Sequence, residues 1–402
     1  MAISRGIIYH KLIDDFKFLF FSFFTNLNNK KYIKKFEKKF SFFNQSKYCI
    51  AMPFARTAFY FIIKSLKLQK GDEVIISPLQ IKAMLEIILH FELKPVIVDI
   101  NKNDLNFNLK DLKNKINKKT KLVLLTYLYG IVPDVTEIKK TIGKKIFLVE
   151  DFSQCLGGKF KNIKVGNFGD FAFYSMSATK TLDAYGGAVI VTNYKDKYKL
   201  VKSNIVHLKS PSRIFLIKKI FVSFFRSFFT NRLIFTYFVI YIFKFMQTLR
   251  LNFFRKFVGS RSFKLNYKKL PNLWFQKITS LQAEAGLKFI KRVKLDDGKR
   301  IKNASKIINF FNRKSFPCKN KNSHNVYWQL CLIHGKSELI QKKLLSKGID
   351  IASPSIALLS KSITSRNLVA NNLYKNIIFI PCYPSLRENE LNLICHNLIK
   401  YV

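Results

Sequence analysis

Near the middle of the 402-residue chain, a lysine and two carboxylates have the types and spacing needed for amine chemistry. The apolar run from Ile146 to Val149 ends in Glu150 and Asp151, and Lys180 follows about thirty residues later, shortly before a Gly-Gly pair. A lysine amine can hold an aldehyde cofactor as a Schiff base, and a carboxylate that faces a pyridine nitrogen keeps that nitrogen protonated. The stretch therefore predicts a site suited to pyridoxal 5'-phosphate.

The same stretch resembles one known family, the DegT/DnrJ/EryC1/StrS sugar aminotransferases, which have the aspartate-aminotransferase fold. The family pattern combines a Glu-Asp-x-x-Gln element, a serine five residues before a lysine and a small-residue turn, matched here by Glu150, Asp151, Gln154, Ser175, Lys180 and Gly186-Gly187. The resemblance implies that Lys180 and Asp151 are catalytic, as the Schiff-base lysine and the partner of the pyridine nitrogen. It also implies that Gln154 lies near the ring hydroxyl and that Ser175 binds the cofactor phosphate.

A second phosphate contact is expected at residues 55–58, Ala-Arg-Thr-Ala, where an amphipathic helix begins. A helix N-terminus offers free N–H groups to a phosphate. The family usually has Ser-Gly-Thr-x-Ala here, so Arg56 and Thr57 are candidate cofactor ligands, Arg56 through its guanidinium. An ordinary helix start is the alternative. The family usually covers the cofactor ring with an aromatic residue or histidine, whereas this chain has Ile81, which would cover it by apolar contact alone.

Short β-rich runs alternate with helical patterns between residues 73 and 150. We expect strands at 73–77, 95–99, 121–127 and 146–149, and helices at 82–91, 109–116 and 135–142. Such alternation predicts an α/β protein with a mostly parallel sheet and helices on both faces. Ligand sites in these sheets lie at the carboxyl ends of strands, which is where Asp151 falls. The resemblance refines the expected fold to the type I fold of pyridoxal-phosphate enzymes, with a small α+β C-terminal domain.

The chain carries 71 Lys and Arg residues against 24 Asp and Glu, a formal net charge of +47. This excess favours an anionic membrane or a nucleic acid as partner. The competing explanation is compositional drift, since Lys, Asn, Ile and Phe are over-used together, as in A+T-rich genomes. No nucleic-acid motif accompanies the charge, so we expect no nucleic-acid partner. The six cysteines and six histidines are scattered, which predicts neither disulfides nor a metal site and favours the cytoplasm.

Residues 197–283 contain no acidic residue, and basic residues punctuate runs rich in phenylalanine. Basic, aromatic helices are typical of in-plane binding to an anionic bilayer, and the longest uncharged run, 233–243, is about half the length of a spanning helix. We therefore expect peripheral attachment to the inner face of the cytoplasmic membrane through residues 201–270. The phenylalanine cluster at residues 16–24 would contribute to this attachment. The alternative is a helical insertion that packs on the protein itself or on a second subunit.

Four regions follow from these patterns: an N-terminal amphipathic segment (1–31), a cofactor-binding domain (32–200), a basic aromatic insertion (201–270), and a returning helix with the small C-terminal domain (271–402). The family pattern resumes near residue 272, so we expect the resemblance to cover about 300 residues. There Phe275 replaces an asparagine that in the family reaches the neighbouring subunit's phosphate. We also expect a strand at 326–334, and Ser385 with Glu388 as the capping box of the last helix.

The resemblance implies a homodimeric aminotransferase that moves an amino group, from glutamate as the expected donor, to a nucleotide-linked keto sugar for surface polysaccharide or lipopolysaccharide. A sister group of dehydratases has histidine in place of the lysine, so Lys180 favours transamination. The alternative is a catalytically impaired, membrane-associated relative with a binding or scaffold role, because the phosphate loop is altered and the stacking aromatic residue is missing.

Overall fold

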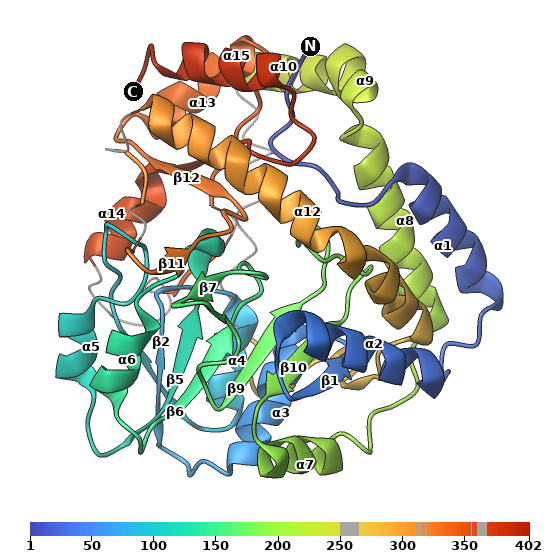
Figure 1. The fold of residues 1–402 in the computed structure, drawn as a ribbon, viewed down its shortest axis with the longest axis vertical. Helices are drawn as coiled ribbons and strands as arrows, with labels where there is room; N and C mark the ends of the chain where they lie inside the picture. Colours follow the sequence, from blue (N-terminus) through green and yellow to red (C-terminus); the bar gives the residue numbers. More distant parts are fainter. Residues whose placement is uncertain (250–264, 312–314, 318–319, 355, 360–367) are drawn as a thin grey trace.

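The protein, in a computed structural model, is described at residues 1–249, 265–311, 315–317, 320–354, 356–359 and 368–402. Its centre is a seven-stranded sheet of order β1-β10-β9-β6-β5-β2-β4 (Figure 1). Strand β10 runs antiparallel to both neighbours, and the other pairings are parallel. The strands span Tyr48–Met52 (β1), Glu73–Ile76 (β2), Lys94–Ile97 (β4), Thr120–Thr126 (β5), Phe147–Asp151 (β6), Phe171–Ser175 (β9) and Ala188–Thr192 (β10).

Helices cover both faces of this sheet, which confirms the predicted α/β class. Alternate residues of a strand point to opposite faces, and two apolar cores result: Leu124 belongs to one and its neighbour Leu125 to the other. One core is closed by α3 (Ala55–Leu66), α4 (Lys82–His90) and α7 (Lys195–Asn204). The other is closed by α2 (Lys30–Asn44), α5 (Leu109–Lys115), α6 (Val135–Ile142) and α12 (Ser280–Phe310).

The 31-residue helix α12 joins the large sheet to the C-terminal part of the chain (Figure 1). Its second half contributes Ala304 and Ile307 to a separate core with an antiparallel pair of strands. That core marks the predicted small domain. Its elements are β12 (Leu330–Ile333), α13 (Ser337–Ser346), α14 (Leu368–Asn376), β14 (Ile377–Ile380) and α15 (Glu388–Leu398).

Short elements connect the two parts. Strand β3 (Leu79–Gln80) pairs with β13 (Ala357–Leu358), and β7 (Lys159–Phe160) pairs with both β8 (Ile163–Lys164) and β11 (Ser323–His324). The described residues also include the 3-10 turns η1 (Leu128–Gly130) and η3 (Asn272–Phe275).

The N-terminal segment and the basic helices lie along one flank of the molecule (Figure 1). Helix α1 (Leu12–Phe24) packs on α8 (Arg213–Phe229), and α10 (Ile240–Thr248) packs on α13. Between α8 and α10 lie α9 (Arg232–Ile234) and a π-helical turn, η2 (Phe235–Val239). Ile3 forms a parallel bridge with Ile349, so the start of the chain is anchored on the C-terminal part. Residues 250–264 of the predicted insertion lie outside the described residues.

Two local predictions were wrong. Strand β12 begins at Leu330 rather than 326, because Val326 and Tyr327 donate their N–H groups to the Gly130 carbonyl instead of a strand partner. The last helix begins at Glu388, and its Glu390 carboxylate accepts the N–H of Arg387 at 2.7 Å, three residues before it. Arg232 draws the Ser385 carbonyl and Glu390 together, which moves the cap two residues along the chain.

Candidate active site

Lys180 lies in a tight loop, residues 176–187, between the adjacent strands β9 and β10. Met176 closes the loop, since its carbonyl accepts the N–H groups of Ala184 and Gly186. Gly187 has a φ of +88°, and a Cβ there would come within 2.9 Å of the Met176 methyl group, so the turn requires glycine. This turn returns the chain to the sheet and holds Lys180 near the carboxyl edge of the parallel strands.

The Lys180 amine and the Asp151 carboxylate interact electrostatically at this edge. Asp151 ends β6, the parallel neighbour of β9, and both side chains are buried. Burial lowers the pKa of Lys180 to about 8, although the negative charge of Asp151 partly opposes this. Burial raises the pKa of Asp151, while hydrogen bonds from Ser153 and the charge of Lys180 partly offset that rise. The site thus supplies an amine that is partly unprotonated near neutral pH.

Glu150, the other carboxylate of the pair, has a different environment. It is completely buried and accepts hydrogen bonds from the Tyr127 hydroxyl at 2.5 Å and from the N–H groups of Gly166, Phe168 and Gly169 at 2.7–2.8 Å. These contacts fix the loop that leads into β9. Glu150 is therefore a structural anchor, and Asp151 is the carboxylate available for chemistry.

Gln154 and Ser175, the two other residues of the motif, both lie close to the loop. The Gln154 side-chain oxygen accepts the N–H of Tyr129 at 2.7 Å. Ser175 ends β9. Its N–H donates to the Ser153 hydroxyl oxygen at 3.0 Å, and its own hydroxyl donates to that of Ser177, also at 3.0 Å. The structure thus groups Ser175 with Asp151 through Ser153.

The predicted phosphate loop is the N-terminus of α3, where the first N–H groups have no partner within the helix. The Arg56 guanidinium lies 4.6 Å from the Phe54 ring centroid and 4.8 Å from that of Trp274. Thr57 is fully buried, and its hydroxyl donates to the Trp274 carbonyl at 2.7 Å. In this conformation the Thr57 hydroxyl is bonded to η3. Only the backbone N–H groups at the start of α3 then remain to bind a phosphate.

Trp328 is a site residue that the sequence analysis missed. Its ring centroid lies 3.9 Å from the Lys180 Nζ, and its indole N–H donates to the Thr179 carbonyl at 2.9 Å. The backbone that positions Trp328 is unusual. Tyr327 has a φ of +45°, and a Cβ on Gly130 would lie 2.5 Å from the backbone nitrogen of Trp328. Ile81, by contrast, is 39% exposed at the start of α4. The sequence analysis placed Trp328 inside the strand expected at 326–334, and therefore gave it no role in the site.

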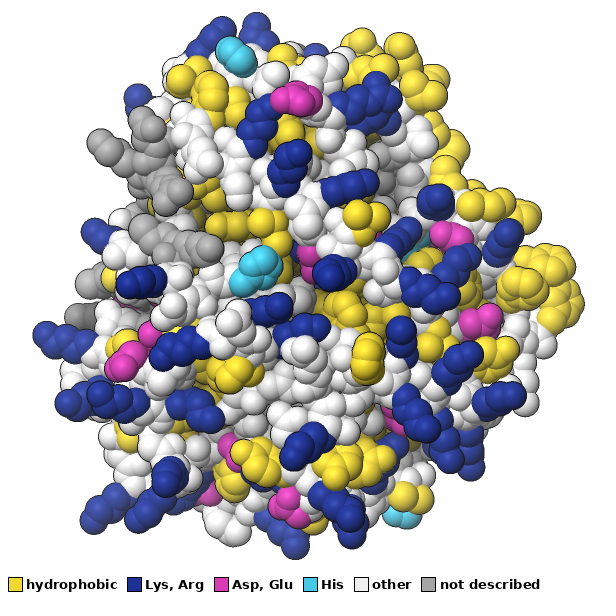
Figure 2. Space-filling view, viewed as in Figure 1, with side chains coloured by type: hydrophobic (Ala, Val, Ile, Leu, Met, Phe, Trp, Pro, Cys, Tyr) yellow, Lys and Arg dark blue, Asp and Glu magenta, His cyan; other side chains and the backbone are white. Residues whose placement is uncertain are grey.

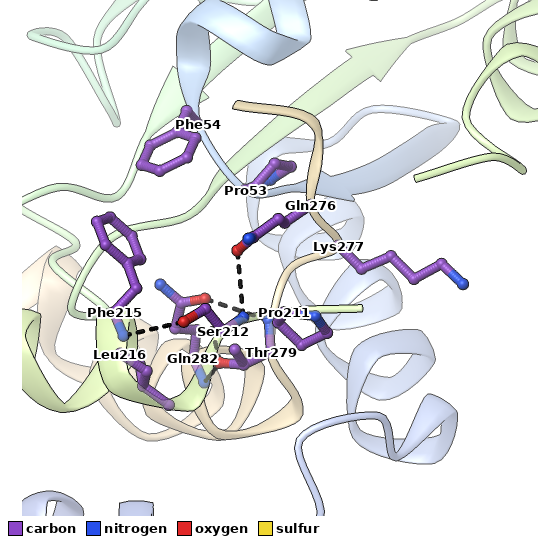
Figure 3. Close-up of a pocket in the computed structure, with 10 residues that line it drawn as sticks. All are labelled: Pro53, Phe54, Pro211, Ser212, Phe215, Leu216, Gln276, Lys277, Thr279 and Gln282. Carbon is purple, nitrogen blue, oxygen red and sulfur yellow. Dashed lines mark hydrogen bonds between the residues drawn. The ribbon is translucent and has the colours of Figure 1, made fainter. Parts of the chain in front are cut away.

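The pocket in Figure 3 is lined by Gln282 and by residues from three other parts of the chain, 53–54, 211–216 and 276–279. It is bordered by the start of α8 and the chain after η3, where Ser212 donates its N–H to the Gln276 side chain at 3.1 Å. None of the predicted site residues lines it. Gln282 is one of the residues that line the pocket. Its side-chain N–H also donates to the Tyr185 carbonyl at 3.1 Å, so Gln282 stabilises the loop that carries Lys180.

Residues 24–209 match the model of the DegT/DnrJ/EryC1/StrS aminotransferase family. The matched segment contains Asp151, Gln154, Ser175 and Lys180. A curated relative, GDP-perosamine synthase of Escherichia coli O157:H7, is 32% identical over 168 residues, which is 42% of this chain and 46% of the relative. The chain is thus matched to about half the length of this relative. The expected resemblance beyond residue 209 lies outside the family match.

Solved structures extend the likeness of the fold to nearly the whole chain. The aminotransferase from Psychrobacter cryohalolentis superposes with a TM-score of 0.76 at 18% identity, covering 99% of this chain and 98% of that one. The E. coli GDP-4-keto-6-deoxy-D-mannose-3-dehydratase with bound hydrated PLP superposes with a TM-score of 0.75 at 19% identity, covering 99% and 100%. The fold of this protein is therefore that of the aminotransferase family, C-terminal part included.

The groups gathered at the carboxyl edge fit pyridoxal 5'-phosphate by their chemistry. They are a buried amine of lowered pKa, a neighbouring buried carboxylate, the Ser175 hydroxyl and a helix N-terminus. The amine suits an aldehyde, the carboxylate suits a protonated pyridine nitrogen, and the hydroxyl with the helix suits a phosphate.

Proposed function

We propose that the protein is a pyridoxal-phosphate-dependent aminotransferase, which moves an amino group from glutamate to a nucleotide-linked keto sugar for surface polysaccharide or lipopolysaccharide synthesis. The observation that carries this proposal is that the buried Lys180 amine and the buried Asp151 carboxylate lie within electrostatic reach of each other at the carboxyl edge of the sheet. Two of the proteins named above, the GDP-perosamine synthase and the GDP-4-keto-6-deoxy-D-mannose-3-dehydratase, are named for GDP-linked sugars, which supports a nucleotide sugar as substrate.

Each residue then has a defined task. When bound, the cofactor supplies a pyridine ring that takes up the electron pair left at the donor's α-carbon. Lys180 holds the cofactor through its Nζ and, once freed, moves the proton of that α-carbon. Asp151 keeps the pyridine nitrogen protonated. Ser175 and the first N–H groups of α3 bind the phosphate, and the Trp328 ring shields the amine from water.

We further propose a homodimer with its two active sites at the interface. In this dimer Phe275 would not supply the contact from one subunit to the cofactor phosphate of the other, because its ring packs within its own chain. The centroids of the Phe275 and Tyr60 rings lie 4.9 Å apart. Another residue of the partner must then approach the phosphate.

The second candidate is a catalytically impaired relative with a binding role. Two observations favour it: the Thr57 hydroxyl is bonded to the Trp274 carbonyl, and Ile81 stands where an aromatic residue would cover the ring. Trp328 favours the enzyme instead, since it brings an aromatic ring to the lysine from a different part of the chain.

Covalent capture of the cofactor distinguishes the two candidates. Purified protein mixed with pyridoxal phosphate and reduced with borohydride should carry the cofactor on Lys180, as located by peptide mass spectrometry. Lys180→Ala should lose this adduct, and Lys164→Ala, the matched control at another lysine whose pKa burial lowers, should retain it. Equal labelling of the Lys180→Ala protein would refute the assignment. Labelling of Lys180 without any amino transfer from glutamate would favour the impaired relative.

A further inference from the structure

Helix α1 directs Asp14, Asp15 and Ser22 into the protein and, except for the buried Phe18, its phenylalanines toward solvent. Asp15 is completely buried and accepts a hydrogen bond from the Ser227 hydroxyl of α8 at 2.6 Å. On the opposite face, Phe16, Phe20 and Phe24 are 59%, 56% and 75% exposed. A helix that packs on its own protein and faces water shows the reverse arrangement. The outer face of α1 is therefore built for an apolar neighbour.

Helix α8 repeats this reversal beside α1. Ser223 and Ser227 lie on its buried face, and the Ser223 hydroxyl is 3.4 Å from the His10 ring. Phe221, Phe225 and Phe229 are exposed on the outer face. Since α1 and α8 pack side by side, their phenylalanines form one apolar surface, visible as the yellow groups along the right flank in Figure 2.

Helix α10 and the π-helical turn before it extend this surface. Tyr237, Phe238 and Tyr241 are 61–67% exposed, while Phe235 and Ile240 are buried against the protein. We call the exposed aromatic residues of α1, α8, η2 and α10 the aromatic face. Such a large exposed apolar area marks an interaction surface.

The helices that carry the aromatic face pack against the rest of the molecule in this fold. Within the described residues, no single helix combines the length and hydropathy needed to cross a bilayer. The α8 segment and the segment Arg232–Thr248 together satisfy this test, but they are bent by 59°. Their inner faces, with Ile220 and Ile240, are buried in the protein core, so the two segments lie against the molecule rather than apart from it.

Within the four elements that carry the aromatic face, the exposed charges are all basic. Its four elements contain two acidic residues, Asp14 and Asp15, and both are buried. Lys17, Lys218 and Arg226 are exposed among the phenylalanines. Near an anionic bilayer each basic residue strengthens attachment about fivefold, from roughly 1 kcal/mol per residue. A second copy of the same face would instead place like charges opposite one another.

We propose that the aromatic face docks in the plane of an anionic lipid bilayer, the inner face of the cytoplasmic membrane. The phenylalanines enter the boundary between headgroups and acyl chains, and the basic residues contact anionic headgroups. This attachment stands apart from the proposed transamination. Its test uses no substrate and no cofactor, so either proposal can fail without the other.

Vesicle co-sedimentation of the full chain tests the attachment. Binding to phosphatidylcholine vesicles should increase as phosphatidylglycerol is added, and it should decrease with salt because counter-ions screen the charges. Replacing Phe16, Phe20 and Phe24 together by serine should lower the partition coefficient at least tenfold. The matched control replaces Ile163, Tyr194 and Leu295, which are 50%, 46% and 62% exposed on other elements, and should bind as the unchanged protein does.

Two results would overturn the proposal. One is that the unchanged protein fails to sediment with anionic vesicles. The other is that the triple phenylalanine variant sediments normally but loses oligomeric mass in analytical ultracentrifugation, which would make the face a contact between subunits. Circular dichroism of each variant verifies that its helices are intact, and the exposure of the three rings makes this the expected result.

Discussion

At the scale of single residues, Glu150 and Asp151 show how neighbours on one strand divide structure and chemistry. Successive strand residues point to opposite faces. Glu150 is surrounded by four donors that hold the loop before β9. Asp151 accepts the N–H of Ser153 at 3.0 Å and faces the lysine amine. One carboxylate holds the fold, and the other carries the proposed chemistry.

This division predicts opposite effects for two conservative substitutions. Glu150→Gln should lower the free energy of unfolding by about 2–4 kcal/mol, because an amide cannot accept all four hydrogen bonds and two N–H groups would lose their charged partner. Asp151→Asn should change it far less, yet it should slow the half-reaction with glutamate. Chemical denaturation and single-turnover absorbance measure the two quantities. A stable Glu150→Gln protein would contradict the structural role.

The lowered pKa of Lys180 gives a second prediction. Because the reactive amine is unprotonated, the rate at which the protein captures pyridoxal phosphate should rise with pH through a midpoint at about 8. Trp328→Ala should move this midpoint upward by admitting water to the amine, and Asp151→Asn should move it downward by removing the charge that favours the ammonium form. Trp328→Phe, which keeps a ring, is the control. Stopped-flow absorbance gives each profile, and shifts in the same direction would refute this account.

At the scale of elements, α12 approaches α2 at a glycine. A Cβ on Gly286 would lie 2.5 Å from the ring of Phe36, which is completely buried. The close approach lets α2 cover the sheet while α12 continues to the C-terminal part. Gly298, further along α12, is exposed, and no atom lies within 4 Å of its added Cβ.

The two glycines therefore predict opposite signs for one substitution. Gly286→Ala should destabilise the protein by about 1–3 kcal/mol through overpacking. Gly298→Ala should stabilise it by about 0.5–1 kcal/mol, because alanine favours the helix. Adding Phe36→Leu should remove most of the penalty of Gly286→Ala, which a double-mutant cycle in denaturant measures. Equal effects at the two glycines would show that the helix contact is looser than the structure has it.

At the scale of the whole molecule, His10 joins the N-terminal segment to the lysine loop and the basic helices. One ring nitrogen lies 3.0 Å from the Asp15 carboxylate of α1, and the other lies 2.9 Å from the Asp183 carbonyl. The Ser223 hydroxyl of α8 faces the same ring, and Phe289 of α12 stacks on it. The aromatic face is thus attached to the loop that carries Lys180.

Titration of His10 should make stability depend on pH. Burial by itself lowers the pKa of His10, but Asp183 and Asp15 outweigh it, so the pKa is raised above its ordinary value of 6.5. The protonated ring stabilises the fold fully below pH 6.5, and this contribution is lost as the pH rises through the folded-state pKa. The melting temperature should thus fall more between pH 6 and 8 in the unchanged protein than in His10→Gln. Parallel slopes would contradict this linkage.

The sequence by itself determined the features that depend on neighbours along the chain. Apolar periodicity gave the strands that end at Asp151 and Ser175, and the spacing of Asp151, Gln154, Ser175 and Lys180 gave the family. These signals are local, because a strand or helix needs the right pattern within about ten residues. Regular alternation also predicted a mostly parallel sheet with helices on both faces, although not the order of its strands.

The tertiary structure decided which distant groups meet. Trp328 contacts Lys180, which lies 148 residues earlier in the chain, and this contact depends on Gly130 and on the left-handed backbone of Tyr327. The Thr57 hydroxyl bonds to a carbonyl 217 residues away. Only the fold shows that α1 buries its two carboxylates and exposes all its phenylalanines except Phe18, because a helical pattern fixes which residues share a face and not which face turns inward. The inward face is chosen by partners such as His10 and Ser227, whose positions depend on packing among elements far apart in the chain.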